Sequence, residues 1–551
     1  MMNLLIWLGN TLILIQPYAK TLAPFLAGVA LFVASQADKT KGFWVRLGLL
    51  SLFFWLGTWG AFNFIVQPNF AGQVAPFPAY DLFLSSLFFA GGLATYLIWL
   101  REGQPWLDAR TESLTKKSSL ERNKKTDVRN ISDFLPPAAG KYDPTQHFKK
   151  EGFFLGLGEG GKPVYFNEER LPHVQVNGFS GSGKSVALGF LAAQCLQKGH
   201  AVAYLDPKFD EWAPFVIAEA ARKAGVTFVV LDLNTPDPQI NMFEGTTIGQ
   251  RKELLEGGFG LTEKGGAADF YSIDDREAAD KCASEYLEGD TPASLFNRYN
   301  TEFAATAKKF NGLLREMAKL PAVNAKSGID LRKIIKDGGA LYVIGSMRTT
   351  SVVRMQRMIL IKIIQLCEER DRISQNPRPV VAILDEAKYH ISKPFMEGLG
   401  AARDKGLSVV VAHQSLQDLR DCPADLNADA VQGAVMENCR LKIIYKAEDP
   451  KTAKWLAEKS GRIQVDDEIR RASRNAAMSE VIDDQRTIRQ AERFLIDENM
   501  IMNLAFGQAV VFGNGLPGFV STSPIPVNKN PQDLQTLAFE GDEIIKAADL
   551  I

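Results

Sequence analysis

The sequence predicts an α/β fold that follows a set of apolar amino-terminal helices. A glycine-rich loop at residues 178–185 separates a short apolar run from a helix-like run. From about residue 150 onward, short apolar runs alternate with helical segments, whereas the first hundred residues contain long stretches without charge. Alternating strands and helices are typical of a parallel sheet with helices packed against it.

Bulk composition restricts the classes of function. The chain has 551 residues, enough for about three or four structural units, and its formal net charge is −1. A near-zero net charge argues against a polycation that coats nucleic acid, so any DNA-binding surface must be local. The five cysteines show no C-x-x-C motif and no metal-ligand spacing, and we interpret them as buried reduced thiols.

Long apolar runs dominate the first hundred residues. Phe43–Val66 carries only Arg46 as a charge, and Leu82–Leu100 carries none. Each approaches the ~20 apolar residues that cross a bilayer as a helix. Two shorter runs, Leu4–Ile15 and Thr21–Ala34, predict either a third span or a helical hairpin, which leaves two, three or four spans open. A buried hydrophobic domain fits less well because the runs lack amphipathic period, and the first run lacks the basic start of a signal peptide.

Charges around this membrane anchor, residues 1–100, predict its orientation. The loop Gln67–Tyr80 has no Lys or Arg, whereas eight Lys or Arg residues occur between residues 101 and 129. Positive residues stay on the cytoplasmic side of a membrane. We therefore expect a multi-pass anchor with everything after residue 101 in the cytoplasm. Residues 101–150 read as a basic cytoplasmic linker, either solvated or touching anionic lipid headgroups.

A phosphate-binding motif occupies residues 178–185, which read Gly-Phe-Ser-Gly-Ser-Gly-Lys-Ser and fit the pattern G-x-x-x-x-G-K-[ST]. It follows a strand-like run, His173–Asn177, and opens a helix-like run, Val186–Gln197. Backbone N–H groups of such a loop wrap phosphates, Lys184 reaches the β- and γ-phosphates, and Ser185 holds Mg²⁺. The motif predicts a nucleoside triphosphate with Mg²⁺ as the ligand, and the expected cytoplasmic position of the loop favours ATP. The residues expected to bind it are Gly178, Ser180, Gly181, Ser182, Gly183, Lys184 and Ser185.

An acidic pair follows a later strand-like run that begins at Val380. We expect Asp385 to hold Mg²⁺ and Glu386 to orient and deprotonate the attacking water. Many buried strands end in an acid, so the pattern is weak by itself. Downstream of a phosphate-binding loop it becomes a strong Walker B prediction.

Two further polar residues flank the run Leu407–Ala412. Gln414 follows its end and is a candidate sensor of the γ-phosphate, with a turn residue as the alternative. Arg403 precedes it and is a candidate arginine finger that reaches a neighbouring subunit's γ-phosphate, with a plain surface arginine as the alternative.

The remaining runs predict the domain organisation. We expect a RecA-like nucleotide-binding core in two parts, residues 151–243 and 329–524, with Walker B on a central strand. Residues 244–328 contain no clear strand and predict an inserted all-α domain, and residues 525–551 predict a short acidic tail. The other expected strands are Ala201–Asp206, Val226–Leu233, Ala340–Gly345, Leu441–Lys446 and Ala509–Phe512.

The order of these features resembles the type IV coupling proteins, the TraD/TraG-type ATPases of conjugation and type IV secretion. The resemblance rests on amino-terminal spans, the phosphate-binding loop, Asp206-Pro207-Lys208, the helical insertion, Leu384-Asp385-Glu386, Arg403 and Gln414, and it covers nearly all of the chain. The loop and Walker B are generic to motors, whereas their order behind a membrane anchor is specific. The family often has a long carboxyl-terminal extension, whereas here we expect only the short tail 525–551, which puts partner recognition by such an extension in doubt.

The resemblance implies a homo-hexamer at the bacterial inner membrane. Its implied partners are single- or double-stranded DNA without sequence preference, a relaxase with its relaxosome proteins, and components of the type IV secretion channel. Such an enzyme recruits the relaxase–DNA complex, or protein substrates, and drives transfer by ATP hydrolysis. Lys208 and Arg348, which follow strands, are candidates for the pore.

Two alternatives stay open beside conjugative DNA transfer. One is an effector-protein receptor of a type IV secretion system that handles no DNA. The other is a DNA pump similar to FtsK and HerA, which the size of the helical insertion and the lack of a carboxyl-terminal sequence-reading module disfavour.

Overall fold

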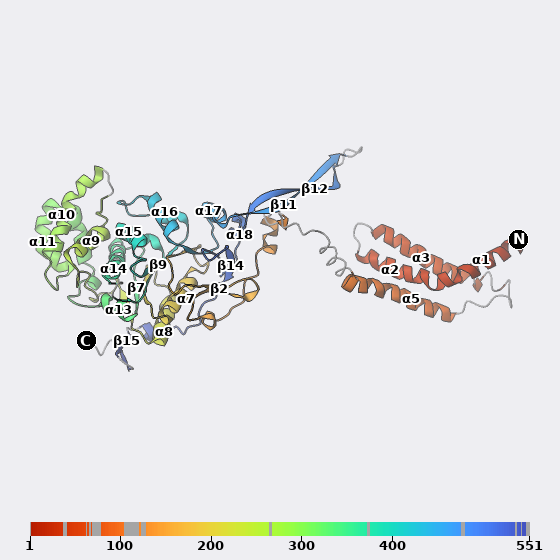
Figure 1. The fold of residues 1–551 in the computed structure, drawn as a ribbon, viewed down its shortest axis with the longest axis horizontal. Coiled ribbons are helices and arrows are strands. Elements are labelled where there is room, and N and C mark those ends of the chain that lie inside the picture. Colours follow the sequence, from red (N-terminus) through yellow and green to blue (C-terminus); the bar gives the residue numbers. More distant parts are fainter. Residues whose placement is uncertain are drawn as a thin grey trace. The chain divides into compact units, whose positions relative to one another are not determined.

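The chain forms two units, Met1–Glu121 and Arg122–Ile551, in a computed structural model (Figure 1). The structure describes residues 2–36, 41–61, 63–64, 68, 79–103, 121–122, 128–263, 267–371, 375–474, 480–534, 537–540 and 543–546. Most of the predicted outside loop 67–80, and residues 104–120 and 123–127 of the predicted linker, lie outside this range.

The first unit is helical. Two of its helices, α3 and α5 with its π-helical extension η2, are long and apolar enough to cross a membrane by length and composition. Helices α1 and α2 meet at a bend of 46° and pass the same test only as a pair. The elements are α1 (Met2–Lys20), α2 (Leu22–Gln36), α3 (Lys41–Ala61), α5 (Ala79–Ile98) and η2 (Trp99–Gly103).

Helices α2 and α5 approach closely at two glycines. A Cβ atom on Gly28 would lie 2.2 Å from the carbonyl oxygen of Phe89, and one on Gly92 would lie 2.2 Å from that of Phe25. Small residues at helix contacts let backbones approach in this way, which is typical of helices that pack within a membrane.

A sheet of thirteen strands organises the second unit. Its order is β16-β15-β6-β7-β5-β8-β9-β4-β10-β13-β14-β2-β3, and neighbours from β6 to β10 are parallel. The central strands are β4 (Val174–Asn177), β5 (Ala201–Asp206), β6 (Phe228–Asp232), β7 (Ala340–Ile344), β8 (Val380–Leu384), β9 (Leu407–His413) and β10 (Leu441–Tyr445). The outer strands are β2 (Phe153–Leu157), β3 (Pro163–Phe166), β13 (Gln508–Phe512), β14 (Gly518–Ser521), β15 (Leu537–Glu540) and β16 (Glu543–Lys546).

Helices cover both faces of this sheet because its parallel strands are buried on both sides. On β5, Val202 and Tyr204 face the cluster that contains α7 and α8, whereas Ala203 and Leu205 face the cluster that contains α14 and α15. The helices of the core are α7 (Lys184–Gln197), α8 (Ala213–Ala224), α14 (Thr350–Glu368), α15 (Lys393–Ala401), α16 (Ala428–Asn438), α17 (Pro450–Ser460) and α18 (Glu498–Met502).

Residues between β6 and β7 form a group of helices. They are α9 (Ile248–Phe259), α10 (Ile273–Ser284), α11 (Pro292–Thr306), α12 (Lys308–Ala318) and α13 (Leu331–Asp337), drawn in green in Figure 1. Buried side chains such as Leu254, Phe303 and Phe310 belong to the same hydrophobic cluster as Met358 and Ile359 of α14. The core is therefore continuous from these helices to one face of the sheet.

Residues of the predicted linker and of the predicted acidic tail also pack on the core. Ile131, from the predicted linker, is buried among α17 and α18. In the predicted acidic tail, Ile525 is buried, and its carbonyl oxygen accepts a hydrogen bond of 3.1 Å from the indole of Trp212. Its Asp542 and Asp549 lie outside the described residues.

A long antiparallel hairpin, β11 (Arg462–Arg474) and β12 (Glu480–Phe494), extends from the second unit (Figure 1). It follows α17 and pairs Arg462 with Phe494 at its base. This hairpin is not among the strands expected from the sequence. The short strand β1 (Glu121–Arg122) marks the boundary of the two units.

Candidate nucleotide-binding site

The predicted site residues other than Arg403 gather at the carboxyl-terminal ends of three adjacent parallel strands. Asn177 of β4 pairs with His413 of β9, and Val411 of β9 pairs with Leu384 of β8. The phosphate-binding loop, the acidic pair and Gln414 directly follow these strands, so register alone brings them together. In open α/β sheets, ligands bind at this edge.

The conformation of the loop depends on glycine. Gly183 has φ +121°, and a Cβ atom there would lie 2.8 Å from the Cε1 atom of buried Tyr445. Gly181 also has a positive φ, +84°, but nothing lies within 4 Å of its Cβ position. A side chain at position 183 would therefore strain the backbone and clash with Tyr445. Glycine avoids both, and it leaves the backbone of the loop accessible to phosphate.

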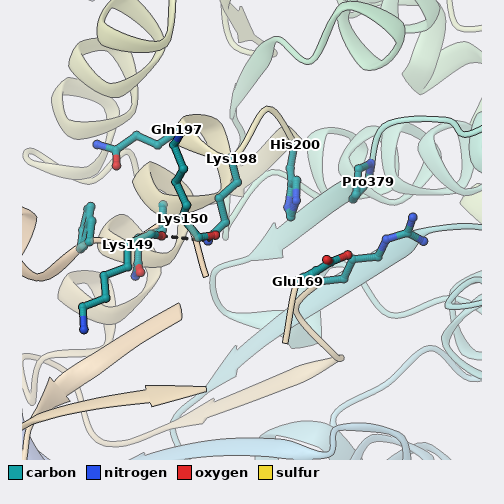
Figure 2. A pocket seen from close by; sticks show the side chains of 10 residues that line it. Lys149, Lys150, Glu169, Gln197, Lys198, His200 and Pro379 are labelled. Atoms are coloured by element: carbon teal, nitrogen blue, oxygen red, sulfur yellow. Dashed lines mark hydrogen bonds between the residues drawn. The ribbon is translucent and has the colours of Figure 1, made fainter. Parts of the chain in front are cut away.

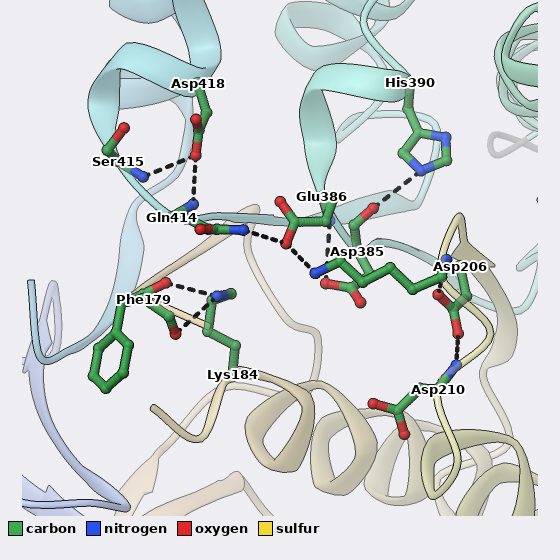
Figure 3. A network of polar contacts seen from close by, with 12 residues as sticks. Phe179, Lys184, Asp206, Asp210, Asp385, Glu386, His390, Gln414, Ser415 and Asp418 are labelled. Atoms are coloured by element: carbon green, nitrogen blue, oxygen red, sulfur yellow. Dashed lines mark hydrogen bonds and ion pairs between the residues drawn. The ribbon is translucent and has the colours of Figure 1, made fainter. Parts of the chain in front are cut away.

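Lys184 is buried under the loop as the first residue of α7 (Figure 3). Its ammonium group donates hydrogen bonds to the carbonyl oxygens of Gly178, at 2.6 Å, and Phe179, at 3.1 Å. Burial lowers the pKa of Lys184, and the charges of Glu386 and Asp385 oppose that shift. Ser185 follows in the first turn of α7 and is half-buried.

Asp385 lies buried at the end of β8. Its backbone N–H donates to the carbonyl oxygen of Leu205 at 3.1 Å, and its Oδ1 atom accepts from the backbone N–H of Glu386 at 3.1 Å. Burial raises the pKa of Asp385 to about 7; Lys208 opposes the shift, and Asp206 and Glu386 add to it. A carboxylate held in this way favours a cation beside it.

Glu386 is held between two side chains from neighbouring strands (Figure 3). Lys208, after β5, forms an ion pair with its carboxylate, and the amide of Gln414, after β9, donates to Oε1 at 2.9 Å. Burial raises the pKa of Glu386, but the bonds from Lys208 and Gln414 outweigh it, and the pKa is lowered. Its backbone has φ +49°, a region that costs a non-glycine residue energy and is found at functional sites.

Lys208 is the site residue whose role the sequence analysis missed. It was a candidate for the pore, whereas the structure places it on Glu386. Its backbone N–H donates to Asp206 Oδ1 at 2.8 Å, so the turn after β5 aims the lysine. The available signal was Asp206-Pro207-Lys208 at the end of the strand that pairs with β8. Arg348, the other candidate, is exposed.

Arg403 is not brought to the loop of its own chain. It is exposed in the turn between α15 and β9, at the amino-terminal end of β9, whereas Gln414 follows the carboxyl-terminal end. Seven residues of strand separate the two edges, about 23 Å at the usual rise per residue. Within one protomer Arg403 and Lys184 therefore lie at opposite edges of the sheet.

These residues fit a nucleoside triphosphate with Mg²⁺. The hydroxyl of Ser182 is buried and has no hydrogen-bond partner among the described residues, and Gly183 keeps the cradle free of a side chain. The described residues contain no group of three His, Cys, Asp or Glu that could hold a metal by themselves. Mg²⁺ is commonly held by one or two protein oxygens together with substrate phosphates, which fits Ser185 and Asp385.

A cavity of about 580 Å³ lies near the amino-terminal ends of β5 and β8, opposite the ends that carry the predicted site (Figure 2). Its lining includes Lys149, Lys150 and Lys198, which invites interpretation as an anion site. The ammonium group of Lys198, however, bonds to the carbonyl oxygens of Lys149, at 3.0 Å, and Lys150, and the ammonium of Lys149 lies 4.3 Å from the ring centroid of Tyr165. The ammonium groups of Lys198 and Lys149 are therefore already engaged within the protein, and the phosphate-binding loop remains the better nucleotide site.

The chain is similar in sequence to proteins of conjugation and mobilization. The model of a family described as the TraM recognition site of TraD and TraG matches residues 379–506. Mobilization protein A of Escherichia coli is 28% identical over 400 residues, which cover 69% of this chain and 74% of that protein.

The fold is similar to that of solved coupling proteins. The unbound bacterial conjugative coupling protein TrwBdeltaN70 matches with a TM-score of 0.51 and 16% identity, covering 72% of this chain and 96% of that one. The plasmid coupling protein TrwB in complex with the ATP analogue ADPNP matches with a TM-score of 0.52 and 15% identity, covering 72% and 98%. Together, the family model, the relative and the shared fold confirm the resemblance to TraD/TraG-type coupling proteins that the order of motifs predicted.

Proposed function

We propose that the chain is a membrane-tethered ATPase that drives conjugative DNA transfer through a type IV secretion channel. The observation that carries the proposal is the meeting of Lys184, Asp385, Glu386 and Gln414 at one sheet edge in a TraD/TraG-type chain. TrwB, whose fold this chain shares, has been solved with ADPNP and with ADP and Mg²⁺, which supports the same ligands here.

Each residue has a chemical task in hydrolysis. Lys184 and the loop N–H groups bind the phosphates, and Glu386 orients and deprotonates the attacking water. Gln414 donates to Glu386 and would sense the γ-phosphate. Mg²⁺ held by Ser185 and Asp385 would neutralise charge on the phosphate oxygens. Arg403, exposed at the other edge, would act on the site of a neighbouring protomer.

The setting of the site follows from the amino-terminal unit and the family. We place the chain in the bacterial inner membrane as a multi-pass protein, because α3 and α5 have the length and composition of spans. The second unit then lies in the cytoplasm, where ATP is available, and assembles as a homo-hexamer. DNA would be held through its backbone without sequence preference.

The partners are a relaxase with its relaxosome proteins and components of the secretion channel. The support is the match of residues 379–506 to a TraM recognition site. That range contains the projecting hairpin β11–β12, whose length reaches away from the sheet (Figure 1).

The experiment measures ATP hydrolysis by the full chain in detergent micelles, with and without DNA. DNA should stimulate hydrolysis, and Lys184→Ala should abolish both hydrolysis and conjugative transfer. Normal transfer by Lys184→Ala would contradict the motor. Stimulation by an export protein but not by DNA would favour the effector-receptor alternative instead.

A further inference from the structure

An aromatic pair, half-buried Phe179 and exposed Phe506, lies at the rim of the phosphate-binding loop. Phe179 is the second residue of the loop, and its ring meets that of Phe506 edge to face, with centroids 6.1 Å apart. Phe506 is 75% exposed, so one of its ring faces is open to solvent. The ammonium of Lys446 lies 5.6 Å from the Phe179 ring centroid. A large apolar face therefore stands beside the site proposed for a triphosphate, next to a lysine that pairs with Glu448 at 2.9 Å.

Phe506 is fixed to the loop through the backbone of the next residue. The N–H of Gly507 donates to the carbonyl oxygen of Ser182 at 3.3 Å, and the carbonyl oxygen of Gly507 accepts from the N–H of Thr522 at 2.7 Å. The side chain of Gln508 accepts from the N–H of Ala505 at 3.1 Å and closes the turn. The exposed ring thus sits on a turn that is tied to the phosphate cradle.

Sheet topology places this turn at the same end of the strands as the phosphate-binding loop. Strand β13 runs antiparallel to β10, and Ala509 pairs with Tyr445. The start of β13 therefore lies at the carboxyl-terminal end of β10, and β10 in turn pairs with β4, the strand that leads into the loop. Phe506 lies on the side of β4 away from Glu386, so a group bound there leaves the hydrolytic residues unobstructed.

We infer that the ring of Phe506, supported by Phe179, is the stacking platform for the base of the bound nucleotide. The inference rests on the proposed function, because it concerns the same nucleotide. A triphosphate in the loop leaves its base outside the cradle, and aromatic side chains bind bases through their ring faces. Phenylalanine has no hydrogen-bonding group, so the platform accepts purine bases without distinguishing their edges.

Binding by the full chain in detergent micelles tests the inference with two probes in the presence of Mg²⁺. ADPNP carries a base, whereas inorganic tripolyphosphate carries only the phosphates. Phe506→Ala should bind ADPNP about tenfold more weakly, the size expected for a lost base–aromatic stack, and should bind tripolyphosphate as the wild type does. Phe506→Tyr should keep the wild-type affinity for both probes.

The matched control is Leu516→Ala, which removes another exposed apolar side chain from the far end of β13 and should change neither affinity. Unchanged ADPNP binding by Phe506→Ala would overturn the inference. An equal loss for both probes would also overturn it, because Phe506 would then support the loop or a contact between copies. A wild-type chain that binds neither probe would contradict the proposed function itself.

Discussion

The ammonium group of Lys208 pairs with the carboxylate of Glu386, joining the loops that follow neighbouring strands β5 and β8. Gln414 donates to the same carboxylate from the other side. The proposed general base is therefore an anion held by two partners in a buried site. Its protonation and its freedom to move both depend on Lys208.

Replacing Lys208 should shift the pH dependence of hydrolysis. In Lys208→Ala, burial is no longer opposed by that ion pair, so the pKa of Glu386 rises. Because the base works only when deprotonated, the acidic limb of kcat/KM against pH should move to higher pH. Lys388→Ala is the control, since it removes a lysine paired at 3.1 Å with the exposed carboxylate of Asp421. A profile for Lys208→Ala that overlays the wild type would show that the pair does not tune the base.

Asp385 should lower the free energy of unfolding at neutral pH, because its carboxyl group is buried where it is proposed to bind a cation. Its pKa is about 7 in the folded protein against 3.8 for an unperturbed aspartate. A raised carboxyl pKa means that stability is full below pH 3.8, falls as pH rises toward 7, and stays reduced above that.

Asp385→Asn should therefore be more stable than the wild type at pH 8, by a few kcal/mol, an order of magnitude set by about 1.4 kcal/mol per pKa unit. At pH 3.5 the difference should vanish, and Mg²⁺-dependent hydrolysis should be lost at every pH. Thermal unfolding without nucleotide or Mg²⁺ measures this. Equal melting temperatures at pH 8 would mean that the carboxylate is not desolvated.

Two glycines of the loop should respond differently to alanine. Gly183→Ala combines a positive φ with a contact of 2.8 Å to Tyr445, whereas Gly181→Ala has the positive φ alone. Strained backbone costs about 1–3 kcal/mol, and the clash adds to it only at Gly183. ADPNP binding should weaken more in Gly183→Ala than in Gly181→Ala. Weaker ADPNP binding by Gly181→Ala than by Gly183→Ala would contradict this, and would mean that the Tyr445 ring moves away and removes the clash.

Arg403 should act only between protomers, because it lies at the opposite sheet edge from Lys184 of its own chain. Arg403→Ala and Lys184→Ala should each be inactive alone, since an arginine finger supplies about 10³–10⁵ in rate. Mixed assemblies contain interfaces that join an intact loop to an intact arginine, and these should recover part of the ATPase rate. Full activity of Arg403→Ala by itself would leave it a surface residue.

The central strands could be read from the sequence because they are buried on both faces and appear as short continuous apolar runs. The expected bounds of β4 to β10 and β13 agree with the structure to within two residues. The hairpin β11–β12 gave no such signal, because 462–494 is rich in charge and the described side chains Arg462 and Glu492 at its base are exposed. Strands β2, β3 and β14 were not predicted. The β2–β3 hairpin joins the sheet through β14, by a pairing of Ser521 with Leu157 that is far apart in the chain and leaves no local signal.

By itself, the sequence determined which groups are available for the proposed chemistry: a loop for phosphates, a lysine, a hydroxyl and two acids, since each follows a local pattern. Only the tertiary structure decided which residues act on one another. It pairs Lys208 with Glu386, places Arg403 at the amino-terminal end of β9, and brings the ring of Phe506 into contact with that of Phe179. These contacts come from strand order and register, which join segments hundreds of residues apart and leave no periodic signature in any one of them.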